Sequence, residues 1–241
     1  HTAIWKTDAS STDWNTASNW STGAVPTTDV NVLIPTGASN YPVISSSGAA
    51  AKNITVNTSA TLTINADSDL TLSGNLVNRG AVTLNSDSSN FASLIVQGTS
   101  SGNITYNRYV NAIGTDEWDL IGSPVASQTI SGFATTNASP LATGGGSGSD
   151  QYAIGVYDNS DDSWTNYTTS TIGDAGSFDI GKGYAMGTDS GATVAFTGTI
   201  STSNETQAIT DNDAANSGAG RIWNLVANPY PSYLNVNTNA D

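Results

Sequence analysis

The sequence predicts an all-β protein with very little helix, in which a β-solenoid is followed by a β-sandwich-like domain. Residues that favour helices are scarce, since the 241 residues include only 6 Lys and Arg and one Met. Thr, Ser, Asn and Gly are abundant instead, a composition typical of strands and turns. Many short segments also alternate apolar residues with Thr or Asn, which indicates strands that are buried on one face.

The first half of the chain contains closely spaced short strands. Ile54, Leu62 and Leu70 lie eight residues apart, and small turns such as Ser73-Gly74 separate the strands. This spacing favours a solenoid of the parallel β-helix type, in which rungs stack and bury a ladder of aliphatic side chains. An antiparallel sandwich built from hairpins is the alternative. The predicted strands are 53–56, 60–64, 69–72, 75–77, 81–84, 93–96 and 103–106.

A change of composition near residue 110 predicts two domains. Residues 1–110 form the solenoid-like domain, and Trp14 and Trp20 are expected to cap its N-terminal end, because an open end would expose the core. Residues 111–241 form the sandwich-like domain, in which aromatic residues return and turn signals recur. We expect the chain to be a piece of a longer parent protein.

The charge and the residue types exclude several functions. The net charge of −14, from 20 acidic and 6 basic residues, argues against binding nucleic acid or an anionic membrane surface. No apolar run is long enough to insert into a membrane. The absence of Cys excludes thiol chemistry, and the single His1 makes a Ser-His-Asp triad untenable. Asp116, Glu117 and Asp119 beside Trp118 suit a solvated strand entrance better than an acid–base pair, so no enzyme is predicted.

Four motifs stand out from the strand and turn pattern of the sequence. They are Trp14-Asn15-Thr16-Ala17-Ser18-Asn19-Trp20 with Val25-Pro26, Leu72-Ser73-Gly74-Asn75-Leu76-Val77-Asn78-Arg79-Gly80, Gly181-Lys182-Gly183-Tyr184, and Trp223-Asn224-Leu225-Val226-Ala227-Asn228-Pro229-Tyr230-Pro231-Ser232. These motifs resemble β-modules of secreted and cell-surface proteins of Bacteroidetes. The resemblance implies a secreted or cell-surface location, export by the type IX system and an adhesin-like role. The C-terminal sorting domain typical of that export route is not visible in the sequence.

Clusters of Asp and Asn suggest a structural Ca²⁺ ion. Asp158, Asp161 and Asp162 lie in one predicted turn, and oxygen ligands of this kind suit calcium. The same residues are common in ordinary β-turns, which is the alternative interpretation. Two further clusters comprise Asn65, Asp67 and Asp69, and Asp211, Asn212, Asp213 and Asn216.

Aromatic side chains in polar, turn-rich segments are candidates for stacking on sugars. Trp164, Tyr167 and Tyr157 are the preferred glycan-binding residues; Trp5, Trp14, Trp20 and Tyr41 are further candidates. The sequence therefore favours a non-catalytic extracellular module for adhesion or for binding a polysaccharide or surface glycan. The first alternative is a structural subunit or stalk of a surface fibre, a filament assembled through strand or solenoid-end contacts. The second is a polysaccharide-active enzyme.

Overall fold

The structure is a computed structural model that describes residues 1–114, 118–139, 141–146, 149–212 and 222–235. It is nearly all β, with 40% strand and 6% helix, which confirms the predicted fold class. The chain divides into two compact units. Unit 1 comprises His1–Arg108, Thr197–Ser203 and the described part of Tyr230–Asp241, and unit 2 comprises the described parts of Tyr109–Phe196 and Asn204–Pro229.

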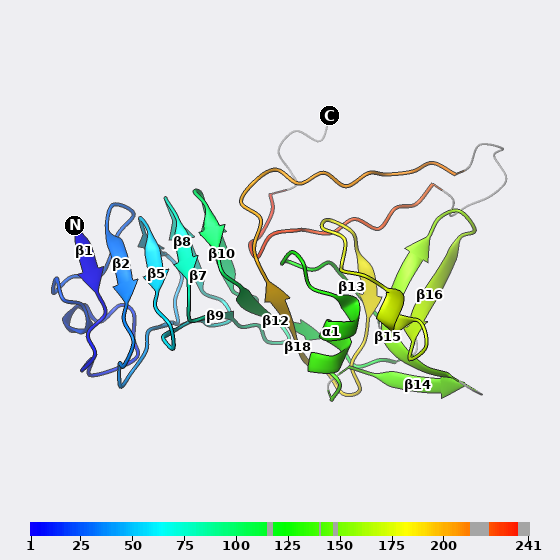
Figure 1. The fold of residues 1–241 in the computed structure, drawn as a ribbon, viewed down its shortest axis with the longest axis horizontal. Helices are drawn as coiled ribbons and strands as arrows, with labels where there is room; N and C mark the ends of the chain where they lie inside the picture. The colour runs from blue at the N-terminus through cyan, green and yellow to red at the C-terminus, as the bar shows by residue number, and fades with distance from the viewer. Residues whose placement is uncertain (115–117, 140, 147–148, 213–221, 236–241) are drawn as a thin grey trace. The chain divides into compact units, whose positions relative to one another are not determined.

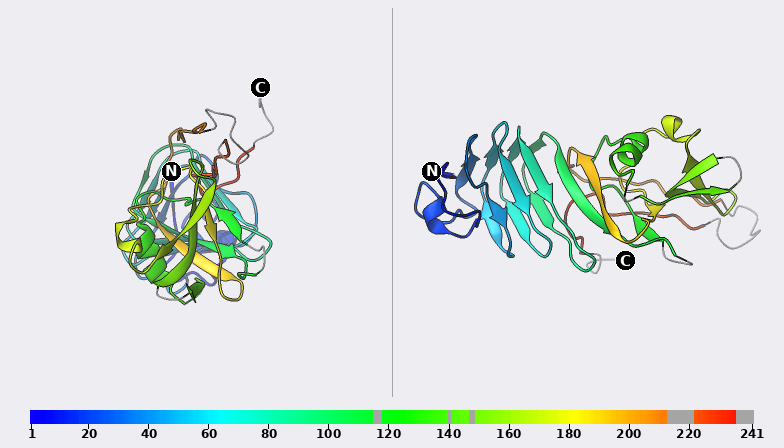
Figure 2. Two further views of the ribbon diagram at one scale, coloured as in Figure 1. Left: turned by 90° about the vertical axis from the view of Figure 1, so that its right-hand side faces the viewer. Right: turned by 90° about the horizontal axis from the view of Figure 1, so that it is seen from below.

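Unit 1 is a β-solenoid of about three turns, as the spacing of its strands predicts. Parallel strands of successive turns lie side by side (Figures 1 and 2). Val32 pairs with Ile54, and Ile54 with Leu76, so these two turns take 22 residues each. The three sheets are β1 (Thr2–Ile4), β2 (Asn31–Ile34), β5 (Ile54–Val56), β8 (Leu76–Asn78) and β11 (Ser100–Ser101); β4 (Ala49–Ala51), β7 (Asp69–Leu72) and β10 (Ser93–Val96); and β3 (Val43–Ile44), β6 (Thr61–Ile64), β9 (Ala81–Leu84), β12 (Ile104–Val110) and β18 (Ala192–Gly198).

The eight-residue spacing in the sequence is the number of residues from one strand to the next strand of the same turn. Ile54, Leu62 and Leu70 lie on β5, β6 and β7, one in each sheet, and all three are buried. Residues of the same column stack from turn to turn instead, as in the buried series Ile44, Ile64, Leu84 and Tyr106. The core of unit 1 is therefore a set of aliphatic ladders that point inward.

Three tryptophans close the N-terminal end of the solenoid. Trp5, Trp14 and Trp20 are fully buried, and the Trp20 ring meets the other two edge to face, with centroids 4.9 and 4.7 Å apart. The Trp20 indole N–H donates to the Trp14 carbonyl at 2.8 Å, and the short 3₁₀ helix η1 (Ala17–Asn19) precedes Trp20. Trp14 and Trp20 thus have the capping role that the sequence suggests, and Trp5, a candidate for sugar stacking, belongs to the same buried cluster.

Unit 2 contains an antiparallel sheet in the order β13 (Asp119–Ile121), β17 (Tyr184–Met186), β15 (Ser149–Asp158) and β14 (Thr143–Gly146). Strand β16 (Ser163–Thr168) forms a hairpin with β15. Helix α1 (Ile130–Thr136) places Phe133 against Phe178 and Phe196, and the 3₁₀ helix η2 (Ile172–Asp174) contacts α1. Thr129 caps α1 by accepting a hydrogen bond from the Gly132 N–H.

Within the described ranges, no helix is long and apolar enough to cross a membrane.

Candidate functional site

A cleft of about 550 Å³ lies within unit 2. Four segments form its walls: the end of the β15–β16 hairpin, the loop before β17, and two extended segments that follow later in the chain. We call this site the unit 2 cleft. Its principal lining residues are Tyr157, Asp158, Asn159, Tyr167, Asp179, Lys182, Tyr184, Gln207, Thr210, Trp223, Asn224 and Leu225.

One wall is made by two motifs that are about 40 residues apart in the sequence. The Gly183 N–H donates to the Leu225 carbonyl at 2.9 Å, and the Ala227 N–H donates to the Gly181 carbonyl at 2.8 Å. A side chain at Gly183 would collide with the Leu225 side chain, so any other residue here would force Leu225 to move. The Gly-Lys-Gly-Tyr and Trp-Asn-Leu-Val motifs therefore lie next to each other and together form this wall of the cleft.

A network of amides and a hydroxyl holds the neighbouring wall. The backbone N–H of Thr210 donates to Asn224 Oδ1 at 3.0 Å, and Asn224 Nδ2 returns a bond to the Thr210 carbonyl at 2.8 Å. Asn159 Nδ2 also donates to the Thr210 carbonyl at 3.0 Å, from the turn of the hairpin. Because Thr210 is bonded from both sides, these three segments are fixed to one another around the cleft.

The cleft contains an ion pair beside two phenols. Lys182 Nζ lies 3.7 Å from Asp179 Oδ2 and 5.9 Å from the centroid of the Tyr184 ring. Burial raises the pKa of Tyr184 to about 12, and burial, followed by the charge of Asp179, raises the pKa of Tyr167. Both phenols are thus neutral at physiological pH and can donate or accept hydrogen bonds.

An aromatic side chain is exposed at the cleft. Trp223 lines the cleft and remains 66% exposed, whereas Tyr184 is almost completely buried. An exposed indole in a wall of polar groups combines an apolar face with hydrogen-bonding neighbours. The composition of the site therefore suits a ligand that is flat and apolar on one side and hydroxylated at its edges.

The predicted glycan-binding residues separate into two places. Tyr157 and Tyr167 line the cleft. Trp164, which is 48% exposed, is not among the lining residues and packs on Tyr157 with ring centroids 5.3 Å apart. Trp164 and Tyr167 are three residues apart on β16, so the alternation of a strand places them on opposite faces. The structure therefore does not bring Trp164 and Tyr167 together.

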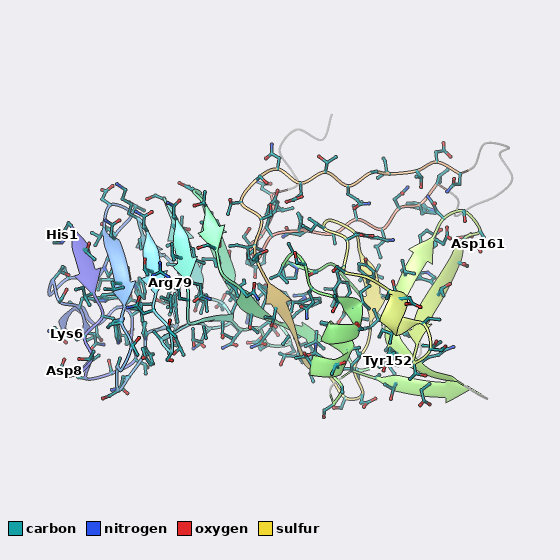
Figure 3. All side chains as sticks on the ribbon, in the orientation of Figure 1. His1, Lys6, Asp8, Arg79, Tyr152 and Asp161 are labelled. Carbon is teal, nitrogen blue, oxygen red and sulfur yellow. The ribbon has the colours of Figure 1, made fainter. Side chains whose placement is uncertain are left out.

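The three predicted calcium ligands take part in hydrogen bonds of the hairpin turn. Asp158 Oδ1 accepts from the Ser160 N–H at 2.8 Å, Asp161 Oδ1 from the Ser163 hydroxyl at 2.6 Å, and Asp162 Oδ1 from the Tyr157 hydroxyl at 2.8 Å. Figure 3 shows Asp161 at this turn, between β15 and β16. The described part of the chain holds no group of three or more His, Cys, Asp or Glu residues close enough to bind a metal ion. Calcium binding stays a prediction.

Other residues singled out in the sequence have structural partners. Asn65 Nδ2 donates to the Ser45 hydroxyl at 3.0 Å, within unit 1. Asp119 accepts hydrogen bonds from the backbone and the side chain of Asn111 at 2.7 and 2.9 Å. Asp116, Glu117, Asp213 and Asn216 lie outside the described residues.

Trp223, Asp179, Lys182 and Tyr184 are site residues that sequence reasoning did not select. Three of them belong to motifs that carry the family resemblance, and Asp179 lies three residues before Lys182. The sequence did mark these motifs as candidates for a site, because they contain the aromatic Trp223 and the basic Lys182. Basic residues are rare in unit 2, whose sequence has only Lys182 and Arg221. Their proximity to one another was not visible in the sequence.

Comparisons with known proteins place the chain in a family but give no function. A search of the curated proteins gave no match, and neither did a search of the solved structures. A family model described as a domain of unknown function, DUF8693, matches residues 4–240, and the chain therefore belongs to this family.

Proposed function

We propose that the protein is a non-catalytic extracellular surface module that binds a glycan in the unit 2 cleft. The observation that carries this proposal is that the exposed indole of Trp223 lines the same cleft as the Lys182–Asp179 ion pair and the Tyr167 phenol. The volume of about 550 Å³ is within the range of small-molecule sites, roughly 300–1,000 Å³.

The electrostatics of the cleft support binding rather than hydrolysis. A glycoside hydrolase generally needs one carboxyl group whose raised pKa keeps its proton for the leaving group. The backbone N–H of Ser160 instead lowers the pKa of Asp158, so this carboxyl group is ionised and unsuited to act as an acid. The extracellular location rests on the acidic, Cys-free composition and on the motif resemblance.

The test is the affinity of the full chain and two tryptophan variants for an array of polysaccharides. Trp223→Ala removes the proposed stacking face, and we expect it to weaken binding at least about tenfold, as for a central aromatic contact. Trp164→Ala is the matched control, because Trp164 is an exposed tryptophan of the same unit outside the cleft lining. Each variant should retain the unfolding midpoint of the wild type, since both side chains are exposed.

Two results would contradict the proposal. Absence of binding across the array, with and without EDTA, would reject glycan binding. Loss of binding in Trp164→Ala but not in Trp223→Ala would reject the Trp223 wall and place the binding surface at Trp164 on the hairpin. Binding that EDTA abolishes would support the calcium prediction for Asp158, Asp161 and Asp162.

A structural subunit of a surface fibre is the second candidate, and it needs a strand edge or solenoid end that a second copy can reach. Strand β10 is an edge strand of its sheet, and the Leu94 N–H on its free side donates to the Pro231 carbonyl at 2.7 Å. The chain's own extended segment thus occupies this edge, so addition of a strand from a second copy would require that segment to be exchanged. The oligomeric state separates the two candidates.

A further inference from the structure

We infer that the unit 2 cleft selects a neutral saccharide with hydroxyl groups on adjacent carbons, in preference to a uronic or sulfated sugar. This inference rests on the proposed glycan-binding function and names the ligand class of the same site. The feature that carries it is the Lys182–Asp179 pair, with 3.7 Å between Lys182 Nζ and Asp179 Oδ2.

A tight turn places the two charged side chains next to each other. The Lys182 N–H donates to the Asp179 carbonyl at 3.2 Å, and Gly181 between them has a φ of +80°. This is the conformation for which the third position of a type II turn requires glycine. The Asp179 N–H also donates to the Tyr184 hydroxyl at 3.1 Å, so the turn is anchored to a buried side chain.

The pair offers a donor and an acceptor side by side, so two neighbouring hydroxyls of one sugar can contact both groups. An ammonium group has three donors, and a carboxylate has about four acceptor sites, so a single contact between them leaves most sites unused. The Lys182 side chain is 32% exposed and that of Asp179 67% exposed, so both remain accessible to a ligand. A vicinal diol can donate to Asp179 from one hydroxyl and accept from Lys182 at the other.

The charge of the cleft opposes an anionic sugar. Among the described residues, the lining includes Asp158 and Asp179 but only Lys182 as a basic residue, and Asp179 already faces Lys182. The net charge of −14 for the whole chain adds to the repulsion at long range. A carboxylate or sulfate on the ligand would have to compete with Asp179 for Lys182 while lying near a second carboxylate.

The experiment measures the affinity of the full chain for matched neutral and charged polysaccharides. Dextran is paired with dextran sulfate, and galactan with polygalacturonate, and mannan and xylan extend the neutral set. The best neutral ligand is then oxidised with periodate, which cleaves vicinal diols, and the resulting aldehydes are reduced with borohydride. We expect binding to neutral polysaccharides and at least about a tenfold loss after periodate treatment, as for the loss of charge-assisted hydrogen bonds.

Variants test the two charged groups separately. Lys182→Met and Asp179→Asn should each weaken binding to the neutral ligand about tenfold or more. Each variant removes one of the two charged groups that form hydrogen bonds with the diol. Lys52→Met, which makes the same charge change on an exposed residue of unit 1, and Asp174→Asn, outside the cleft lining, should leave affinity unchanged.

The outcomes distinguish the ligand class from the proposed function. Binding confined to polygalacturonate or dextran sulfate would overturn the inference and leave glycan binding intact. Unchanged affinity after periodate treatment, or in both Lys182→Met and Asp179→Asn, would also overturn it. Absence of binding to every polysaccharide would reject the inference together with the proposed function.

Discussion

Asparagine side chains connect successive turns of the solenoid. Asn53 Nδ2 donates to Asn31 Oδ1 at 2.7 Å, and Asn53 Oδ1 accepts the Asn75 backbone N–H at 2.7 Å. A second series follows another column, where Asn107 Nδ2 donates to Asn85 Oδ1 at 2.9 Å. The amide group suits this position because it has both donors and acceptors, so each residue can bond to the turn before and the turn after.

Replacing one member of the first series should destabilise unit 1. We expect Asn53→Ala to lower the free energy of unfolding by about 1–3 kcal/mol, because two hydrogen bonds are lost, one to the half-buried Asn31 Oδ1 and one from the Asn75 N–H. Asn57→Ala is the control, since this half-buried residue of the same turn has no side-chain hydrogen bond to the described residues. Equal urea midpoints for the two variants would contradict a stabilising role for the series.

At the scale of elements, the tryptophan cap completes a structure that repeats along one axis. Each turn of a solenoid buries its neighbours, so the terminal turn needs a separate cover. Trp20 packs against both Trp5 and Trp14 and bonds to the Trp14 carbonyl. The cap is therefore part of the core of unit 1 rather than a binding surface.

Removal of the central cap residue should be among the most destabilising changes in unit 1. We expect Trp20→Ala to lower the free energy of unfolding by about 3–5 kcal/mol, as for other fully buried tryptophans. Trp164→Ala, at an exposed position, should change it by less than about 0.5 kcal/mol. Urea unfolding followed by circular dichroism measures both, and similar midpoints would show that the cap contributes little.

Tyr106, the last residue of the buried column that begins at Ile44, should make unit 1 less stable in alkali. Burial raises the pKa of Tyr106 to about 12 from its usual 10, and its hydroxyl donates to the Ala92 carbonyl at 3.0 Å. The unfolded chain therefore loses this proton first, so the stabilising contribution is present below pH 10 and is lost as the pH rises toward 12. Tyr106→Phe should remove this part of the alkaline loss.

The measurement for this alkaline effect is the urea midpoint of wild type and Tyr106→Phe between pH 8 and pH 11.5. The midpoint of the wild type should fall more steeply above pH 10. Parallel curves for the two proteins would mean that Tyr106 ionises equally in the folded and unfolded states.

At the scale of the whole molecule, the exposed surfaces favour a protein that does not self-associate. The three tryptophans cover the N-terminal end of the solenoid, and the Pro231 carbonyl occupies the Leu94 N–H at the β10 edge. The net charge of −14 also makes copies repel one another. All three features oppose assembly through the N-terminal end of the solenoid or the β10 edge.

We therefore expect a monomer at all accessible concentrations. Light scattering over a concentration series at physiological salt should give a constant mass near 24.6 kDa. A mass that rises with concentration would favour the fibre subunit over the glycan-binding module. Pro231→Ala retains the backbone carbonyl that accepts the Leu94 N–H, so this variant should have the same mass as the wild type.

The local patterns of the sequence determined the fold class of this protein. Alternation of Thr with Leu or Ile predicts the strands of unit 1, because successive side chains in a strand point to opposite faces. The even spacing of Ile54, Leu62 and Leu70 predicts a solenoid, and the paired Trp14 and Trp20 predict its cap. These features depend on residues that are near one another in the chain, which is why the sequence reveals them.

Only the tertiary structure decided which residues form the cleft. Tyr157 and Tyr167 were accessible to sequence reasoning because one hairpin carries both. Trp223 and Lys182 lie about 40 residues apart, and the backbone bonds between Gly183 and Leu225 bring their segments together. Composition cannot reveal that contact, because it depends on a glycine that leaves room for a leucine from a distant segment.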